Sequence, residues 1–206
     1  MKQQLRFALV FLVACIGSMY LHELGHAVFG WIQGIPVFPS PAKEYVLWPS
    51  VTWRQEALIA VGGAGATAVI VLASILWGAM SRGWTSCAVL AGVLVEPAFY
   101  TLRAVLTGRG HDGTEWQEAQ YAIGLNPTGH AFDLLFAVLF FSGCAALAFR
   151  DALSLRWRSL SKACALGFLG LMALIAVQIG NNAIFDRHFP KAHTTGIPME
   201  VKESAN

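Results

Sequence analysis

Charge is scarce in this sequence. Lysine, arginine, aspartate and glutamate make up 13% of its 206 residues, about half the share that is usual in soluble domains. The net charge of +2 is too small to indicate a nucleic-acid partner, and no basic stretch is interleaved with aromatic residues. We therefore expect neither an ordinary soluble domain nor a protein that binds nucleic acid.

Cysteine is also scarce, and its spacing excludes one class of metal site. The four cysteines are Cys15, Cys87, Cys144 and Cys164, all in or beside apolar runs. Because no two of them have CxxC spacing, a cysteine-ligated metal is not expected, and they are interpreted as small buried apolar residues. Internal repeats, low-complexity tracts and long linkers are absent as well, which predicts a single domain over residues 1–206.

Apolar runs are what the sequence has in abundance. Hydrophobic residues make up 56% of the chain, and several uncharged runs reach the roughly 20 residues that a helix needs to cross a bilayer. The predicted spans run from about 7–32, 57–80, 83–107, 131–149 and 163–185. Five spans cannot close a barrel, and in lipid every backbone group must be paired within the chain, so the spans are predicted to be helices. The predicted fold is an all-α, polytopic membrane protein of about five transmembrane helices.

The first apolar run is interpreted as a retained span. Lys2 and Arg6 precede the run FALVFLVAC, which resembles a signal peptide ending at Cys15. The apolar run continues through Leu21, however, and is longer than the apolar core of a signal peptide, which has about 7–15 residues. We expect a multi-pass integral protein of the cell (inner) membrane.

The polar residues of the spans gather toward one side. If the five helices alternate in direction, the side opposite the N-terminus holds His22, Glu23, His26, the glycines of 62–66, Arg103, Gln178 and Asn181. Ionisable residues within a membrane are functional-site candidates by default. One polar cavity is therefore predicted to open on that side. The segments 33–56, 108–130 and 186–206 lie on the same side, and the alternative for 108–130 is a solvated, charged loop that only connects two spans.

The stretch HELGH, residues 22–26, predicts a zinc site within the membrane. On a helix, His22 and His26 lie on one face about 5–6 Å apart at Cβ, so both rings can bind one ion. Glu23 lies about 100° further round the helix, beside that ion, where it can deprotonate a zinc-bound water. Three ionisable groups in an apolar span cost several kcal/mol, which argues against a purely structural role. Zn²⁺ is the predicted cofactor, with His22 and His26 as ligands and Glu23 as the catalytic base.

Catalytic zinc sites usually take a third protein ligand. The segment after the third span is dense in ligand-type residues, and its candidates in order of preference are Asp112, Glu115, His111 and Glu118. Asp112 precedes Gly113, which permits an unusual backbone turn. Thr114 and Gln117 have the spacing of a capping box, which predicts a short helix that carries Glu115. Asp112 and Glu115 both remain candidate ligands.

The third predicted span carries three more informative residues. Glu96 and Arg103 are seven apart and so share one helix face. They are predicted to pair with one another, or Glu96 lines the cavity. Pro97 is predicted to kink the helix beside it.

A membrane helix that bears HELGHA, with an aspartate–glycine pair near the third span, resembles the site-2 protease family of intramembrane zinc metalloproteases. The resemblance implies a zinc endopeptidase that cuts substrates within or near the membrane. It implies His22 and His26 as zinc ligands, Glu23 as the base and Asp112 as the third ligand. GRGHDG stands where that family has a longer pattern before its aspartate–glycine pair, so the choice between Asp112 and Glu115 stays open.

The predicted function is that of an intramembrane zinc metallopeptidase that hydrolyses peptide bonds of membrane-associated protein substrates. Its expected partners are such a substrate and the lipid bilayer. No appended regulatory domain is recognisable, so regulation is expected from a membrane partner. Two alternatives stay open: a catalytically inactive, protease-like membrane protein that serves as a binding or assembly module, and a zinc hydrolase of a non-peptide substrate.

Overall fold

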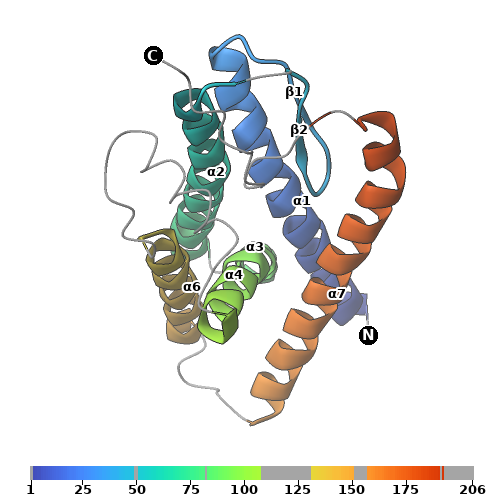
Figure 1. Cartoon of the computed structure of the whole chain (residues 1–206). Helices are drawn as coiled ribbons and strands as arrows, with labels where there is room; N and C mark the ends of the chain where they lie inside the picture. The colour runs from blue at the N-terminus through green and yellow to red at the C-terminus, as the bar shows by residue number, and fades with distance from the viewer. Residues whose placement is uncertain are drawn as a thin grey trace.

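The predicted helical membrane fold is confirmed by the computed structural model, which describes residues 2–48, 51–81, 83–107, 131–150, 157–190 and 192. Its helices are α1 (Lys2–Ile32), α2 (Trp53–Met80), α3 (Trp84–Val93), α4 (Val95–Thr107), α6 (Ala131–Arg150) and α7 (Trp157–His188). Two short strands, β1 (Val37–Pro39) and β2 (Glu44–Val46), follow α1. Figure 1 shows the strands between the upper parts of α1 and α7.

Four helical segments in the described ranges are long and apolar enough to cross a membrane: Gln4–Ile32, Leu58–Met80, Trp84–Leu106 and Ala165–His188. They correspond to the first, second, third and fifth predicted spans. The fourth predicted span corresponds to α6, whose apolar stretch Leu134–Leu147 is shorter than the other four.

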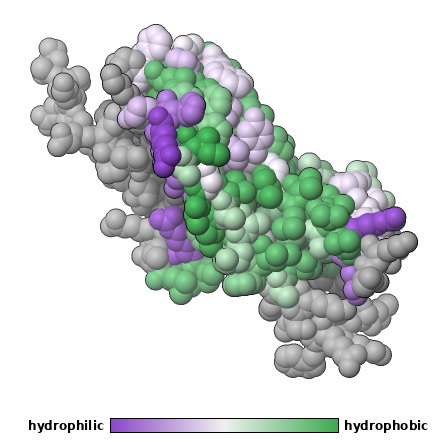
Figure 2. Space-filling view, turned by 90° about the vertical axis from the view of Figure 1, so that its right-hand side faces the viewer, coloured by the Kyte–Doolittle hydropathy of each residue, from purple (hydrophilic) through white to green (hydrophobic). Residues whose placement is uncertain are grey.

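Large apolar side chains cover much of the outer surface. Val13 on α1, Val69 on α2 and Phe168 on α7 are each about two-thirds exposed. In water such a surface would be costly to hydrate, whereas lipid tails solvate it. Figure 2 shows this broad apolar face on the α7 side, with hydrophilic residues gathered toward its margins.

Small residues allow α1 and α2 to pack closely, as expected for helices in a membrane. Gly25 of α1 lies directly against Gly62 of α2. A Cβ atom on Gly25 would overlap the Gly62 carbonyl oxygen and lie 2.7 Å from the Cβ of Ala66. This contact sets the distance between the helix that carries HELGH and its neighbour.

The third span breaks into α3 and α4 at Leu94, as the prediction of a kink near Pro97 anticipates. Proline has no N–H to donate to the carbonyl four residues earlier, and its ring crowds that carbonyl. Here the affected carbonyl belongs to Val93, the last residue of α3. Helical bonding resumes at once, because the Ala98 N–H donates to the Leu94 carbonyl at 3.0 Å. The new helix carries Glu96 toward α1.

The segment after α1 forms a short β-hairpin that packs into the core. Strands β1 and β2 pair antiparallel with the register Val37↔Val46, Phe38↔Tyr45 and Pro39↔Glu44. Val37 and Val46 are buried in a cluster with Ala27, Ile35 and Ile59, from α1, the following loop and α2. Burial of these apolar side chains holds a hairpin that would be marginal on its own.

Candidate metal centre

His22 and His26 point their rings at one another, as their spacing on α1 predicts. Both are buried, with exposed fractions of 3% and 1%, and their Nε2 atoms lie 3.1 Å apart. Two nitrogens that each lie 2.0–2.1 Å from one tetrahedral ion are about 3.3 Å apart. The pair therefore has the separation that a shared metal requires.

The other nitrogen of each ring is held by a neighbouring helix. The Nδ1–H of His26 donates to the Ile59 backbone carbonyl at 2.8 Å. The Nδ1 of His22 lies 2.9 Å from Thr67 Oγ1 and 3.3 Å from Glu96 Oε1. Metal-binding histidines almost always donate their second N–H to a carbonyl or carboxylate, which leaves Nε2 free to bind the ion. The surroundings of both rings follow this pattern.

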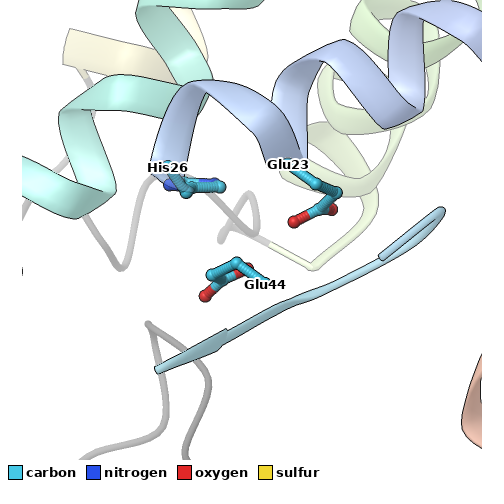
Figure 3. Close-up of side chains that lie close together, drawn as sticks. All are labelled: Glu23, His26 and Glu44. Atoms are coloured by element: carbon cyan, nitrogen blue, oxygen red, sulfur yellow. The ribbon is translucent and has the colours of Figure 1, made fainter. Parts of the chain in front are cut away.

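Two further carboxylates approach the histidines. Glu23 follows His22 on α1, and Glu44 comes from β2 on the other side of the same space (Figure 3). Ligand atoms of Glu23, His26 and Glu44 all lie within 4.8 Å of one another, and all three residues are buried. This group could hold a metal ion.

Charge also favours a cation at this place. Glu23, Glu44 and Glu96 are all buried around the same histidine pair. Carboxylates taken out of water are stable only when they are paired, protonated or bound to metal. Arg103 of α4 also lines this space and adds a positive charge from the protein itself. A divalent ion beside the histidines would offset the remaining negative charge.

These residues line one cavity of about 320 Å³, a size typical of small ligand sites. Its polar side comes from α1, the hairpin and α4, and includes Arg103. Its apolar side comes largely from Leu171, Leu174 and Ile175 of α7. The prediction that polar groups from distant spans meet in one cavity is confirmed for His22, Glu23, His26, Glu96, Arg103 and Gln178.

The predicted site residues divide into two sets. The structure brings His22, Glu23 and His26 together as expected. Asp112 and Glu115, together with the short helix predicted to start at Thr114, lie outside the described residues. The choice between those two ligands therefore stays a prediction. Glu96 lines the cavity beside His22, which is one of the two roles considered for it.

The sequence did not single out Glu44, which lines the cavity, or Thr67, which contacts His22. For Glu44 a signal exists, because the runs VFP and EYV have β-favouring residues on either side of a serine–proline turn. Thr67 lies four residues after Gly63, hence on the same face of α2. Gly63 abuts the His26 ring, while Thr67 contacts the His22 ring. This face of α2 therefore supports both histidines.

The hairpin is also fastened to α7. The Tyr45 hydroxyl donates to Asp186 Oδ1 at 2.7 Å and accepts from Asn181 Nδ2 at 3.2 Å. Lys43 Nζ lies 3.3 Å from both carboxylate oxygens of Asp186. Burial, followed by the bond to Asp186, raises the pKa of Tyr45 above its ordinary value. The hydroxyl therefore stays protonated and remains a donor throughout the neutral range.

The chemistry of the site is the ground on which a function can be inferred, because one fold hosts many unrelated activities. No protein-family model matches this chain, and neither a curated protein nor a solved structure is significantly similar to it.

Proposed function

We propose that this chain is a zinc metallopeptidase of the membrane that hydrolyses peptide bonds of membrane-embedded or membrane-associated proteins. One observation carries the proposal: the His22 and His26 Nε2 atoms face one another at 3.1 Å, and Glu23 lies with His26 in a buried group that could hold a metal ion. The sequence HELGH supports the same chemistry, since HExxH on a helix supplies two zinc ligands and a general base.

Each residue has a role in this proposal. His22 and His26 hold Zn²⁺, while Thr67 and the Ile59 carbonyl keep both rings oriented. Bound zinc acts as a Lewis acid toward a carbonyl group and toward water. Glu23 takes up a proton from the attacking water and delivers it to the departing amine, a contribution of about 10²–10⁴ in rate. Asp112 or Glu115 is the proposed additional ligand from the segment after α4.

The position of the site supports a substrate within or beside the bilayer. HELGH lies inside a helix that is apolar enough to cross a membrane. The cavity wall opposite Glu23 and His26 includes Leu174 and Ile175 of α7, which suit an apolar side chain better than a charged one. The resemblance of HELGHA to site-2 proteases points the same way. We place the protein in the cell (inner) membrane, where a membrane partner regulates it.

The test compares isosteric variants of the full chain, purified in detergent and returned to liposomes. Glu23→Gln should keep about one zinc per chain, because it leaves both histidines in place. It should cut a fluorogenic single-span peptide at least 100-fold more slowly than the wild type, the lower bound for a lost general base. Glu56→Gln is the matched control, since Glu56 is a buried glutamate of α2 that does not line this cavity.

Four results would overturn parts of the proposal. If Glu23→Gln cleaves the peptide as fast as the wild type, Glu23 is not the general base. A wild-type protein that binds zinc but cleaves no peptide is a binding or assembly module. Hydrolysis of an ester probe without peptide cleavage indicates a non-peptide substrate. Unchanged zinc content in both His22→Ala and His26→Ala removes the metal site from α1.

A further inference from the structure

Glu44 enters the metal centre from a part of the chain that the HExxH pattern does not cover. It lies 18 residues beyond His26 and on a strand rather than a helix. Its side chain is only 5% exposed, and its carboxylate faces Glu23 and His26 (Figure 3). No feature of the proposed mechanism uses this carboxylate.

We propose that Glu44 is a ligand of the metal held by His22 and His26, and that Tyr45 positions it by fastening the hairpin to α7. The inference rests on the metal site of the proposed function. Two imidazoles and a carboxylate are a donor set found in catalytic zinc sites. In this inference Glu44 supplies that carboxylate in place of Asp112 or Glu115, so that the fourth position of the zinc ion stays open for water.

The geometry of a strand gives the adjacent residues Glu44 and Tyr45 different roles. Successive side chains of a strand point to opposite faces, so Glu44 faces the metal group while Tyr45 faces α7. Phe38 opposes Tyr45 in the register, and both rings pack on Phe185 and Phe189, with centroids 5.0–6.4 Å apart. One face of the hairpin is therefore anchored while the other presents a carboxylate.

The polar anchors of the hairpin differ in strength. Tyr45 is 2% exposed, and its hydroxyl bond to Asp186 is charge-assisted, the stronger class of hydrogen bond. The ion pair between Lys43 and Asp186 has side chains that are 27% and 45% exposed, and such surface pairs contribute little. Loss of the Tyr45 hydroxyl should therefore loosen Glu44, whereas loss of the Lys43 ammonium should not.

The experiment measures metal binding by the full-length protein in detergent, with Zn²⁺ for affinity and Co²⁺ as a spectroscopic probe. Glu44→Gln should bind Zn²⁺ at least 10-fold more weakly and change the visible spectrum of bound Co²⁺, because one ligand is lost. Tyr45→Phe should weaken Zn²⁺ binding by about 10–100-fold, the usual effect of an outer partner. Its Co²⁺ spectrum at saturation should keep the wild-type shape, because the ligands are unchanged. Tyr20→Phe, the matched control, removes the same hydroxyl from an exposed residue of α1 that does not line the cavity, and it should stay within about 2-fold of the wild type.

The outcomes separate this inference from the proposed function. Wild-type affinity and spectrum in Glu44→Gln, combined with metal loss in His26→Ala, overturn the role of Glu44 and leave the metallopeptidase proposal intact. Metal binding that is unchanged in His26→Ala removes the site itself. Equal affinities for Tyr45→Phe and Tyr20→Phe overturn the positioning role of Tyr45. If Glu44→Gln does not fold, Glu44→Asp decides, because a shortened ligand should give an altered Co²⁺ spectrum and a non-ligand should give the wild-type spectrum.

Discussion

The Nε2 atoms of His22 and His26 face one another at 3.1 Å. The Ile59 carbonyl can only accept a hydrogen bond, so the Nδ1 of His26 carries the proton and a neutral ring has its lone pair on Nε2. If His22 donates from Nδ1 to Thr67 or Glu96, its Nε2 also has a lone pair. Two lone pairs at this distance repel unless a proton or a metal ion lies between them. The space between the two rings is therefore suited to a proton or a metal ion.

Thr67→Val should weaken zinc binding although it replaces none of the proposed zinc ligands. The substitution keeps the shape of the side chain but removes the hydroxyl that lies 2.9 Å from His22 Nδ1, so the ring loses one of its two outer partners. We expect a roughly 10-fold loss of affinity, at the lower end of the range for outer partners because Glu96 remains. A zinc titration against a competing chelator measures it. Thr67→Ser keeps the hydroxyl and should bind like the wild type; equal losses in both variants would contradict the prediction.

Gly63→Ala should disturb His26 through packing alone. A Cβ atom at this position would overlap the His26 ring, whereas one on Gly65 meets nothing within 4 Å. We expect Gly63→Ala to lower zinc affinity at least 10-fold and to destabilise the fold by about 1–3 kcal/mol, as is usual for overpacking. Gly65→Ala adds the same methyl group to the same helix and should change neither quantity. Zinc titration and thermal unfolding in detergent test both variants, and identical behaviour of the pair would refute this account of α2.

Gly25→Ala tests the close approach of α1 and α2. The added methyl group would overlap the Gly62 carbonyl oxygen, so the helices must separate, at a cost of about 1–3 kcal/mol. Thermal unfolding should therefore occur at a lower temperature than in the wild type. Gly17→Ala, on the same helix but with nothing within 4 Å of the added atom, should unfold like the wild type. A Gly25→Ala protein as stable as Gly17→Ala would mean that this contact does not hold the helices together.

If the third ligand comes from the segment after α4 rather than from Glu44, Asp112→Ala should weaken zinc binding more than Glu115→Ala does, because the aspartate–glycine pair resembles the third-ligand position of site-2 proteases. Parallel zinc titrations of the two variants give the order directly. The reverse order would assign the ligand to Glu115. Wild-type affinity in both, beside a loss in Glu44→Gln, would leave Glu44 as the carboxylate ligand of the two histidines.

The sequence by itself determined the features that depend on local geometry. Apolar runs of bilayer length predicted the membrane helices, because the backbone bonds of a helix close within the run itself. The four-residue spacing of His22 and His26 predicted that their rings meet, since one helical turn separates them. Pro97 predicted the break between α3 and α4, because the missing N–H acts only four residues back.

Only the tertiary structure decided what surrounds the histidines. Thr67 is 45 residues from His22, and it reaches that ring because Gly25 and Gly62 let two helices touch. Glu44 reaches Glu23 and His26 because the hairpin that carries it buries its valines against α1 and α2. Tyr45 also fastens this hairpin to α7 through Asp186, which is 141 residues away in the sequence. Such contacts follow from the packing of segments far apart in the chain. Hydrophobic pattern and helix periodicity specify only the secondary structure of each segment and which of its residues share a face.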